Sequence, residues 1–112
     1  MKVNIGPYKS EYEEPCGREI DIQIEKFDTW NMDHTLAMII VPMLKQLKET
    51  THGYPSNFSS HDEWNAVLDE MIWAFEAIVR DEYILADDYK ATMDRIQRGT
   101  ELFGKYYTNL WD

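Results

Sequence analysis

One segment places a histidine next to a carboxylate, the residue types that hold metal ions or move protons. Asp33 and His34 are adjacent in the stretch DTWNMDHTLAMIIVPMLKQLKETTHG. A metal site needs three or four converging ligands, and no further carboxylate or histidine follows until Glu49. We therefore interpret Asp33 as the N-cap of a helix, where a negative charge also suits the helix dipole.

A second segment, His61-Asp62-Glu63, has the same residue types in direct succession. Three neighbours on one helical turn point in different directions, and all three suit a first turn. The single Cys16 stands in a Glu-Pro-Cys-Gly turn without a nearby cysteine or histidine, so we expect a free thiol in a reducing compartment. The sequence thus predicts no catalytic residue, no metal ligand and no cofactor.

Carboxylates also line one face of the predicted helix 60–82. Asp62, Asp69 and Glu76 are seven residues apart, so they align along a helix, with Trp73 between the last two. All-helical nucleotide pyrophosphohydrolases hold Mg²⁺ with carboxylate pairs on adjacent turns, because Mg²⁺ takes oxygen ligands in near-octahedral geometry. The helix has no carboxylate pair at a spacing of three or four. A metal-dependent nucleotide phosphohydrolase with an altered motif is therefore the alternative function.

The charge balance favours an interaction protein as the leading, non-enzymatic function. The 112 residues carry a formal net charge of −10, which repels nucleic-acid phosphates. Residues 59–83 hold seven acidic side chains against one arginine. We predict that the face formed by Asp69, Trp73 and Glu76 binds a basic surface, on a host or phage protein or on a second copy of the chain. In the alternative, the acids only maintain solubility and Trp73 packs against the N-terminal arm.

The chain has no basic and apolar leader and no apolar run of ~18 residues that would suggest a membrane span. We expect a protein made in the cytoplasm with no membrane attachment. Its length suits one domain with a single core.

The N-terminal third reads as an arm followed by a strand. Residues 1–18 contain turn formers and no helical period, which predicts an irregular arm. Residues 19–27, EIDIQIEKF, alternate with three isoleucines on one face, which predicts a half-buried strand. Val3 and Ile5 also alternate and would supply an antiparallel partner. We expect a two-stranded ribbon, or a strand completed by another subunit.

Apolar residues at spacings of three and four predict helices over about 33–50, 60–82 and 88–109. Pro42 lies inside the first, where it removes a backbone donor, so we expect a kink or a break into two short helices. Ser60 and Glu63 have the spacing of a capping box at the start of the second.

The third helix carries a heptad seam of apolar residues. Gly99 and Gly104 interrupt its helix propensity, which suggests close backbone contact or fraying. We predict a mainly α (α+β) fold, with a short β-ribbon and then a three-helix bundle, in which 19–112 form one domain and the first helix packs between the other two. The predicted core residues are Trp64, Met71, Phe75, Ile96 and Phe103.

Four blocks of the sequence stand out: IGPY, DTWNMDHTLA with the following PMLKQLKETTHG, VLDEMIWAFE and LFGKYYTNLWD, of which the last three lie within residues 19–112. Together they resemble a family of small uncharacterised proteins of tailed bacteriophages and marine viral metagenomes. This chain lacks the acidic insert after His-Gly, and the further sequence between IGPY and the strand, that members often have. The resemblance implies a phage protein that acts in an infected bacterial cell, as a host-takeover factor or a minor virion component. It implies no catalytic residue.

Overall fold

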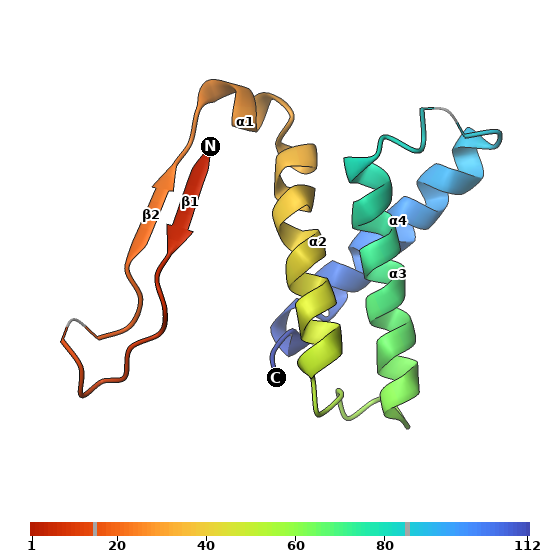
Figure 1. Cartoon of the computed structure of the whole chain (residues 1–112). Coiled ribbons are helices and arrows are strands. Elements are labelled where there is room, and N and C mark those ends of the chain that lie inside the picture. The colour runs from red at the N-terminus through yellow and green to blue at the C-terminus, as the bar shows by residue number, and fades with distance from the viewer. Residues whose placement is uncertain (15, 85) are drawn as a thin grey trace. The chain divides into compact units, whose positions relative to one another are not determined.

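The protein is mainly helical, with a small antiparallel sheet at its N-terminus, as the sequence predicts (Figure 1). The computed structural model describes residues 1–14, 16–84 and 86–112. Its elements are β1 (Lys2–Ile5), β2 (Ile20–Gln23), α1 (Lys26–Trp30), α2 (Met32–Thr50), α3 (His61–Val79), α4 (Tyr89–Lys105) and the short 3-10 helix η1 (Tyr107–Asn109). The chain divides into two compact units, Met1–Met32 and Asp33–Asp112. The predicted α-rich domain begins at residue 19, before the second strand, whereas the second unit begins at Asp33.

In the N-terminal unit, β1 and β2 pair antiparallel, which confirms the predicted ribbon. Val3 lies opposite Ile22, and Ile5 lies opposite Ile20. The predicted irregular arm is wrong at its start, because β1 lies inside it. The predicted strand 19–27 is too long, since β2 ends at Gln23 and a helical turn follows. Pro15 of the expected Pro15-Cys16-Gly17 turn lies outside the described residues, and Cys16 is an exposed free thiol.

The short helix α1 was not predicted, because five residues are too few to show a period. It is fixed at its start by local polar contacts. The Glu25 N–H donates to Asp28 Oδ2 at 2.8 Å, and the N-terminal ammonium lies 3.1 Å from the same oxygen. These contacts, the Glu25 N–H first, hold the pKa of Asp28 below its usual value.

Helix α2 runs without interruption through Pro42, so the predicted break into two helices is wrong. A proline in a helix interior removes one backbone hydrogen bond, and the apolar residues on both sides keep the period that packs this helix. Asp33 lies in the first turn of α2 rather than at the N-cap, because the helix already begins at Met32. Its charge still suits the positive end of the helix dipole.

Helix α3 has well-defined caps at both ends. Ser60 is the N-cap, and its hydroxyl accepts from the Glu63 N–H at 3.2 Å. The Glu63 carboxylate accepts from the N–H and the hydroxyl of Ser59. The predicted capping box is therefore present in one half only, because Glu63 bonds back to Ser59 and not to the N-cap Ser60. At the other end, Asp81 has a φ of 54° and its N–H donates to the Ile78 carbonyl.

The Glu82 N–H donates to the Ala77 carbonyl at 3.0 Å, which completes a Schellman motif with the Asp81 contact. Helix α3 therefore ends at Val79, three residues before the predicted end. The sequence did not indicate this helix end, because an aspartate occupies the left-handed position that usually holds glycine.

Helices α3 and α4 approach closely at Gly99. A Cβ on Gly99 would overlap the Ala74 side chain and lie 2.7 Å from the Glu70 carbonyl oxygen. Gly104 has open space around it. The expected close contact is therefore confirmed at Gly99 alone. Helix α4 ends at Lys105, earlier than predicted, and the chain continues into η1.

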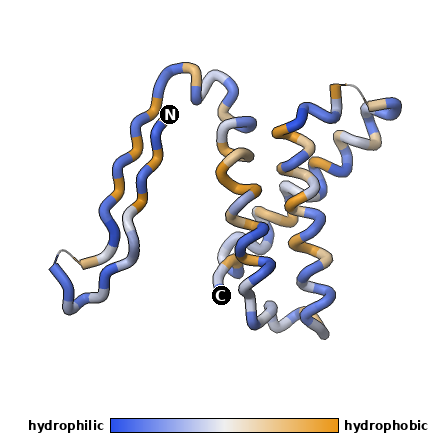
Figure 2. Tube along the Cα trace, viewed as in Figure 1, coloured by the Kyte–Doolittle hydropathy of each residue, from blue (hydrophilic) through white to orange (hydrophobic). Residues whose placement is uncertain are grey.

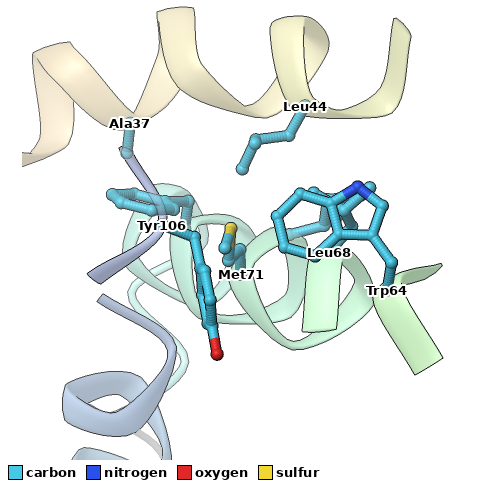
Figure 3. Close-up of a cluster of buried hydrophobic side chains, with 8 residues drawn as sticks. Ala37, Leu44, Trp64, Leu68, Met71 and Tyr106 are labelled. Atoms are coloured by element: carbon cyan, nitrogen blue, oxygen red, sulfur yellow. The ribbon is translucent and has the colours of Figure 1, made fainter. Parts of the chain in front are cut away.

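The core of the helical unit is centred on α3 (Figure 3). This helix supplies seven buried residues, whereas α2 supplies only Ala37 and Leu44. The predicted central place of the first helix is therefore wrong. Of the predicted core residues, four are buried and Phe103 is partly buried against the Phe75 ring, with centroids 5.0 Å apart. Tyr106 was missed, although its ring packs on Trp64 at 5.5 Å.

Candidate functional site

The acidic residues that the sequence places on one face of α3 form ion pairs with α2. Lys48 Nζ lies 2.6 Å from Asp69 Oδ1, and Lys45 Nζ lies 2.5 Å from Glu76 Oε1. Arg80 adds a longer contact to Glu76 at 3.7 Å. The lysines are three residues apart on one side of α2, so both reach the same side of α3. The structure thus places Asp69 and Glu76 on one face, where lysine side chains of α2 in the same chain pair with both carboxylates.

Trp73 is half-buried under an arginine of α4. The Arg95 guanidinium carbon lies 3.8 Å from the Trp73 ring centroid, which is a cation–π stacking distance. Two nitrogens of Arg95 also donate to the Glu70 carboxylate, at 3.2 and 3.3 Å. Trp73 therefore contacts α4, and a partner that used its ring face would have to displace Arg95.

His34 has a structural role at the C-terminal end of α3. Its Nε2 lies 2.9 Å from the Val79 carbonyl oxygen, and because a carbonyl only accepts, the ring donates this hydrogen bond. The last carbonyls of a helix lack partners within the helix. His34 therefore satisfies one of them and ties the first turn of α2 to the end of α3.

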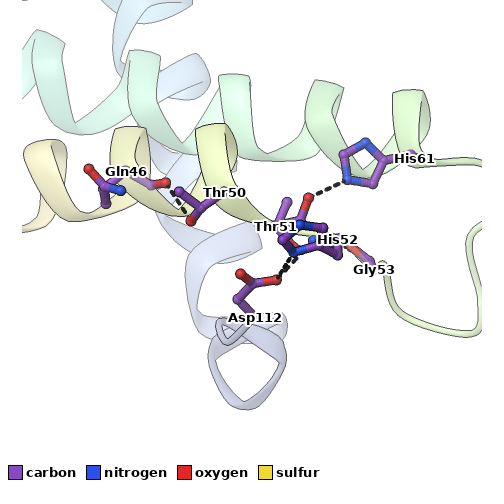
Figure 4. A network of polar contacts seen from close by, with 7 residues as sticks. All are labelled: Gln46, Thr50, Thr51, His52, Gly53, His61 and Asp112. Atoms are coloured by element: carbon purple, nitrogen blue, oxygen red, sulfur yellow. Dashed lines mark hydrogen bonds and ion pairs between the residues drawn. The ribbon is translucent and has the colours of Figure 1, made fainter. Parts of the chain in front are cut away.

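The loop between α2 and α3 meets the C-terminal residues in a polar network (Figure 4). Asp112 Oδ1 accepts from the His52 N–H at 2.9 Å and lies 3.2 Å from its ring Nδ1. These contacts, the backbone N–H first, lower the pKa of Asp112. His61 Nε2 donates to the Thr51 carbonyl at 3.2 Å. This network was not predicted, because it joins residues sixty positions apart in the sequence.

A pocket of about 340 Å³ lies beside the network, with Tyr54, Trp64 and Trp111 among its lining residues. An apolar pocket of about 540 Å³ separates α2 from the end of α4, lined by residues such as Ile40, Leu47 and Phe103. Within the described ranges, no three His, Cys, Asp or Glu side chains are grouped so as to hold a metal ion. Across those same ranges, no helix combines the length and apolar character needed to cross a bilayer.

Hydrophobic and hydrophilic residues alternate along both strands of the ribbon in the N-terminal unit (Figure 2). Its register puts four β-branched side chains on one face, at exposed fractions of 43% for Val3, 44% for Ile5, 65% for Ile20 and 48% for Ile22. We call these four residues the ribbon face. The predicted half-buried strand is therefore wrong as regards burial, because the alternation is present but all four side chains are exposed.

The other side of the ribbon is polar. Lys2 pairs with Gln23, and Asn4 pairs with Asp21. Just beyond β2, Phe27 and Trp30 stack at 5.5 Å and are also exposed. Among residues 1–14 and 16–32, none is buried. The ribbon thus has one apolar and one polar side, as a strand pair packed on one side has. The described residues of the N-terminal unit nevertheless form no core of their own.

No family model, curated protein or solved structure matches the chain. The resemblance to phage proteins therefore stands as an expectation.

Proposed function

We propose that the chain is a small acidic bacteriophage protein that acts by binding another protein chain and not by catalysis. It works in the infected bacterial cell, as a host-takeover factor or as a minor virion component. The resemblance of its sequence blocks supports the phage origin. The exposed apolar side chains of the ribbon face support the mode of action.

The ribbon face carries the proposal because of its size and exposure. An isolated two-stranded ribbon is marginally stable in water, and it gains stability when a hydrophobic face packs against another element. Burial of an apolar side chain contributes roughly 1.5–3 kcal/mol relative to its exposure. Four β-branched side chains on one regular face therefore form a surface that a protein partner would stabilise strongly.

The Asp69, Trp73 and Glu76 face is the weaker candidate surface for a basic partner. A basic partner would compete with Lys45, Lys48 and Arg95, which already occupy these side chains. Exchanging one ion pair for another at an exposed site changes the free energy little. The geometry therefore favours the ribbon face as the main docking surface.

The test places a photoreactive benzoylphenylalanine at position 22 of the protein in infected cells. Ile22 lies on the ribbon face, and its neighbour Gln23 lies on the opposite face, so a probe at position 23 is the matched control. We expect a covalent adduct with a protein chain from position 22 and little from position 23. No protein adduct from position 22, or equal adducts from both, would refute the proposal.

A further inference from the structure

We propose that a pocket in the helical unit binds a small organic cation, one with an alkylammonium head such as a trimethylammonium group. It is the pocket of about 340 Å³ beside the contact of His52 with Asp112, and we call it the aromatic pocket. All of its lining residues belong to the unit Asp33–Asp112. The inference therefore does not depend on the ribbon face, and the two proposals can fail separately.

Three aromatic side chains line the aromatic pocket, Tyr54, Trp64 and Trp111. Trp64 is almost fully buried, and its ring packs against Phe58 at 5.4 Å and Tyr106 at 5.5 Å, so its position is fixed. Tyr54 and Trp111 are exposed and stand on the solvent side of the pocket. Aromatic rings gathered around one space recognise quaternary ammonium ions, because the electron-rich ring faces attract a cation that has no hydrogen to donate.

A carboxylate lies on the same pocket. Asp112 Oδ1 accepts from the His52 N–H at 2.9 Å, a contact drawn in Figure 4. This hydrogen bond is the largest of the causes that lower the pKa of Asp112, so the group is ionised at neutral pH. Among the described residues that line the pocket, none is a lysine or an arginine. A cationic ligand would therefore supply the permanent positive charge that the pocket itself does not provide.

The charge of the helical unit favours a cation over an anion. Residues 33–112 carry fourteen acidic and seven basic side chains. A field of this sign draws cations to the surface and repels phosphates and carboxylates. A neutral apolar molecule would fit the aromatic walls, but it would remove water from the Asp112 carboxylate without a compensating contact. The volume is at the low end of the roughly 300–1,000 Å³ of small-molecule sites, which suits a single head group.

The first experiment is an NMR titration of the whole chain with choline. The four tryptophans give four indole N–H signals, of which Trp64 and Trp111 report on the pocket, while Trp30 and Trp73 are internal controls. We expect saturable shifts of the Trp64 and Trp111 signals alone, with a Kd on the order of 1 mM. The matched ligand is the neutral carbon analogue of choline, in which a tert-butyl group replaces the trimethylammonium group. It should bind at least tenfold more weakly.

The second experiment changes the pocket. Asp112→Asn removes the charge and keeps an oxygen that can accept from the His52 N–H, and Trp111→Leu removes one aromatic wall at an exposed position. Each variant should bind choline at least fivefold more weakly than the parent. The matched controls, Asp87→Asn and Trp30→Leu, remove the same groups from exposed positions that do not line the pocket. Both controls should bind choline like the parent.

Three results would overturn the inference. The first is a titration without a saturable shift of the Trp64 and Trp111 signals. The second is equal affinity for choline and its carbon analogue, which would mean that the pocket selects apolar shape and not charge. The third is an Asp112→Asn variant that binds choline like the parent while its circular dichroism is unchanged.

A short peptide with one trimethyllysine, titrated in the same way, identifies the source of the head group. Binding at least tenfold tighter than that of choline supports the site and indicates a cation carried on a protein chain. Equal or weaker binding of the peptide, with choline bound as expected, supports the site and indicates a free small molecule.

Discussion

Single residues decide how closely α3 and α4 pack, and the two glycines of α4 provide a matched pair. Gly99→Ala should lower the free energy of unfolding by about 1–3 kcal/mol, because the new methyl group would overlap Ala74 and the Glu70 carbonyl. The gain in helix propensity, about 1 kcal/mol, offsets part of this loss. Urea denaturation followed by circular dichroism measures the difference.

Gly104→Ala is the control for that substitution. Nothing lies near the position of its Cβ, so the propensity term acts alone and the variant should gain up to about 1 kcal/mol. Equal changes at both glycines would contradict the close approach of the two helices.

The left-handed Asp81 offers a stabilising substitution. Its φ of 54° suits glycine better than a residue with a Cβ. Asp81→Gly should raise the free energy of unfolding by about 1 kcal/mol, as seen in the urea midpoint. Asp81→Ala removes the same charge and keeps the Cβ, so it should give no gain. A gain of the same size from alanine would mean that charge, and not backbone conformation, is responsible.

At the scale of elements, the α3 and α4 interface depends on aromatic packing. Phe75→Ala should cost roughly 3–5 kcal/mol, since the ring is buried and contacts Phe103. The exposed Phe27 of the N-terminal unit is the control, and Phe27→Ala should leave the unfolding of the helical unit unchanged. A Phe75→Ala midpoint in urea equal to that of the parent would contradict the core described here.

The N-terminus of α3 should respond to acid through Glu63. The Ser59 N–H, and then the Ser59 hydroxyl, lower the pKa of the Glu63 carboxyl in the folded protein. A carboxylate with a lowered folded pKa contributes stability that is fully present above its unfolded pKa. This contribution is lost as the pH falls through the lower, folded value.

A side-chain NMR titration checks this expectation. Glu63 should titrate below the usual range for a glutamate. Ser59→Ala should move its pKa only part of the way back, because the backbone N–H is the larger cause and remains. A full return to the usual value would assign the effect to the hydroxyl instead.

On the scale of the whole molecule, the sequence predicted the kind and order of the main elements. Apolar residues at helical or strand spacing show that one face of an element is packed. This can be read from the sequence without knowing what that face packs against. Which residues of two helices meet depends on segments that are far apart in the sequence. It was therefore not predictable that Lys45 and Lys48 reach the acidic face of α3, or that Arg95 covers Trp73.

The ribbon shows a second limit of sequence reasoning. Alternation of isoleucines with acidic residues predicted a two-sided strand, and the pairing of β1 with β2 confirms it. The same alternation says nothing about what covers the apolar side. The candidate surface that matters most was therefore visible as a pattern, while its exposure required the structure.

The absence of a buried residue among 1–14 and 16–32 has a consequence for hydrogen exchange. With no buried side chain among these residues, the amide hydrogens of the ribbon should exchange through local openings of low free energy. A protein partner bound to the ribbon face would add protection to these amides, since binding holds the ribbon closed. The amides of α3 belong to the packed helical unit and would serve as an internal standard in the same measurement.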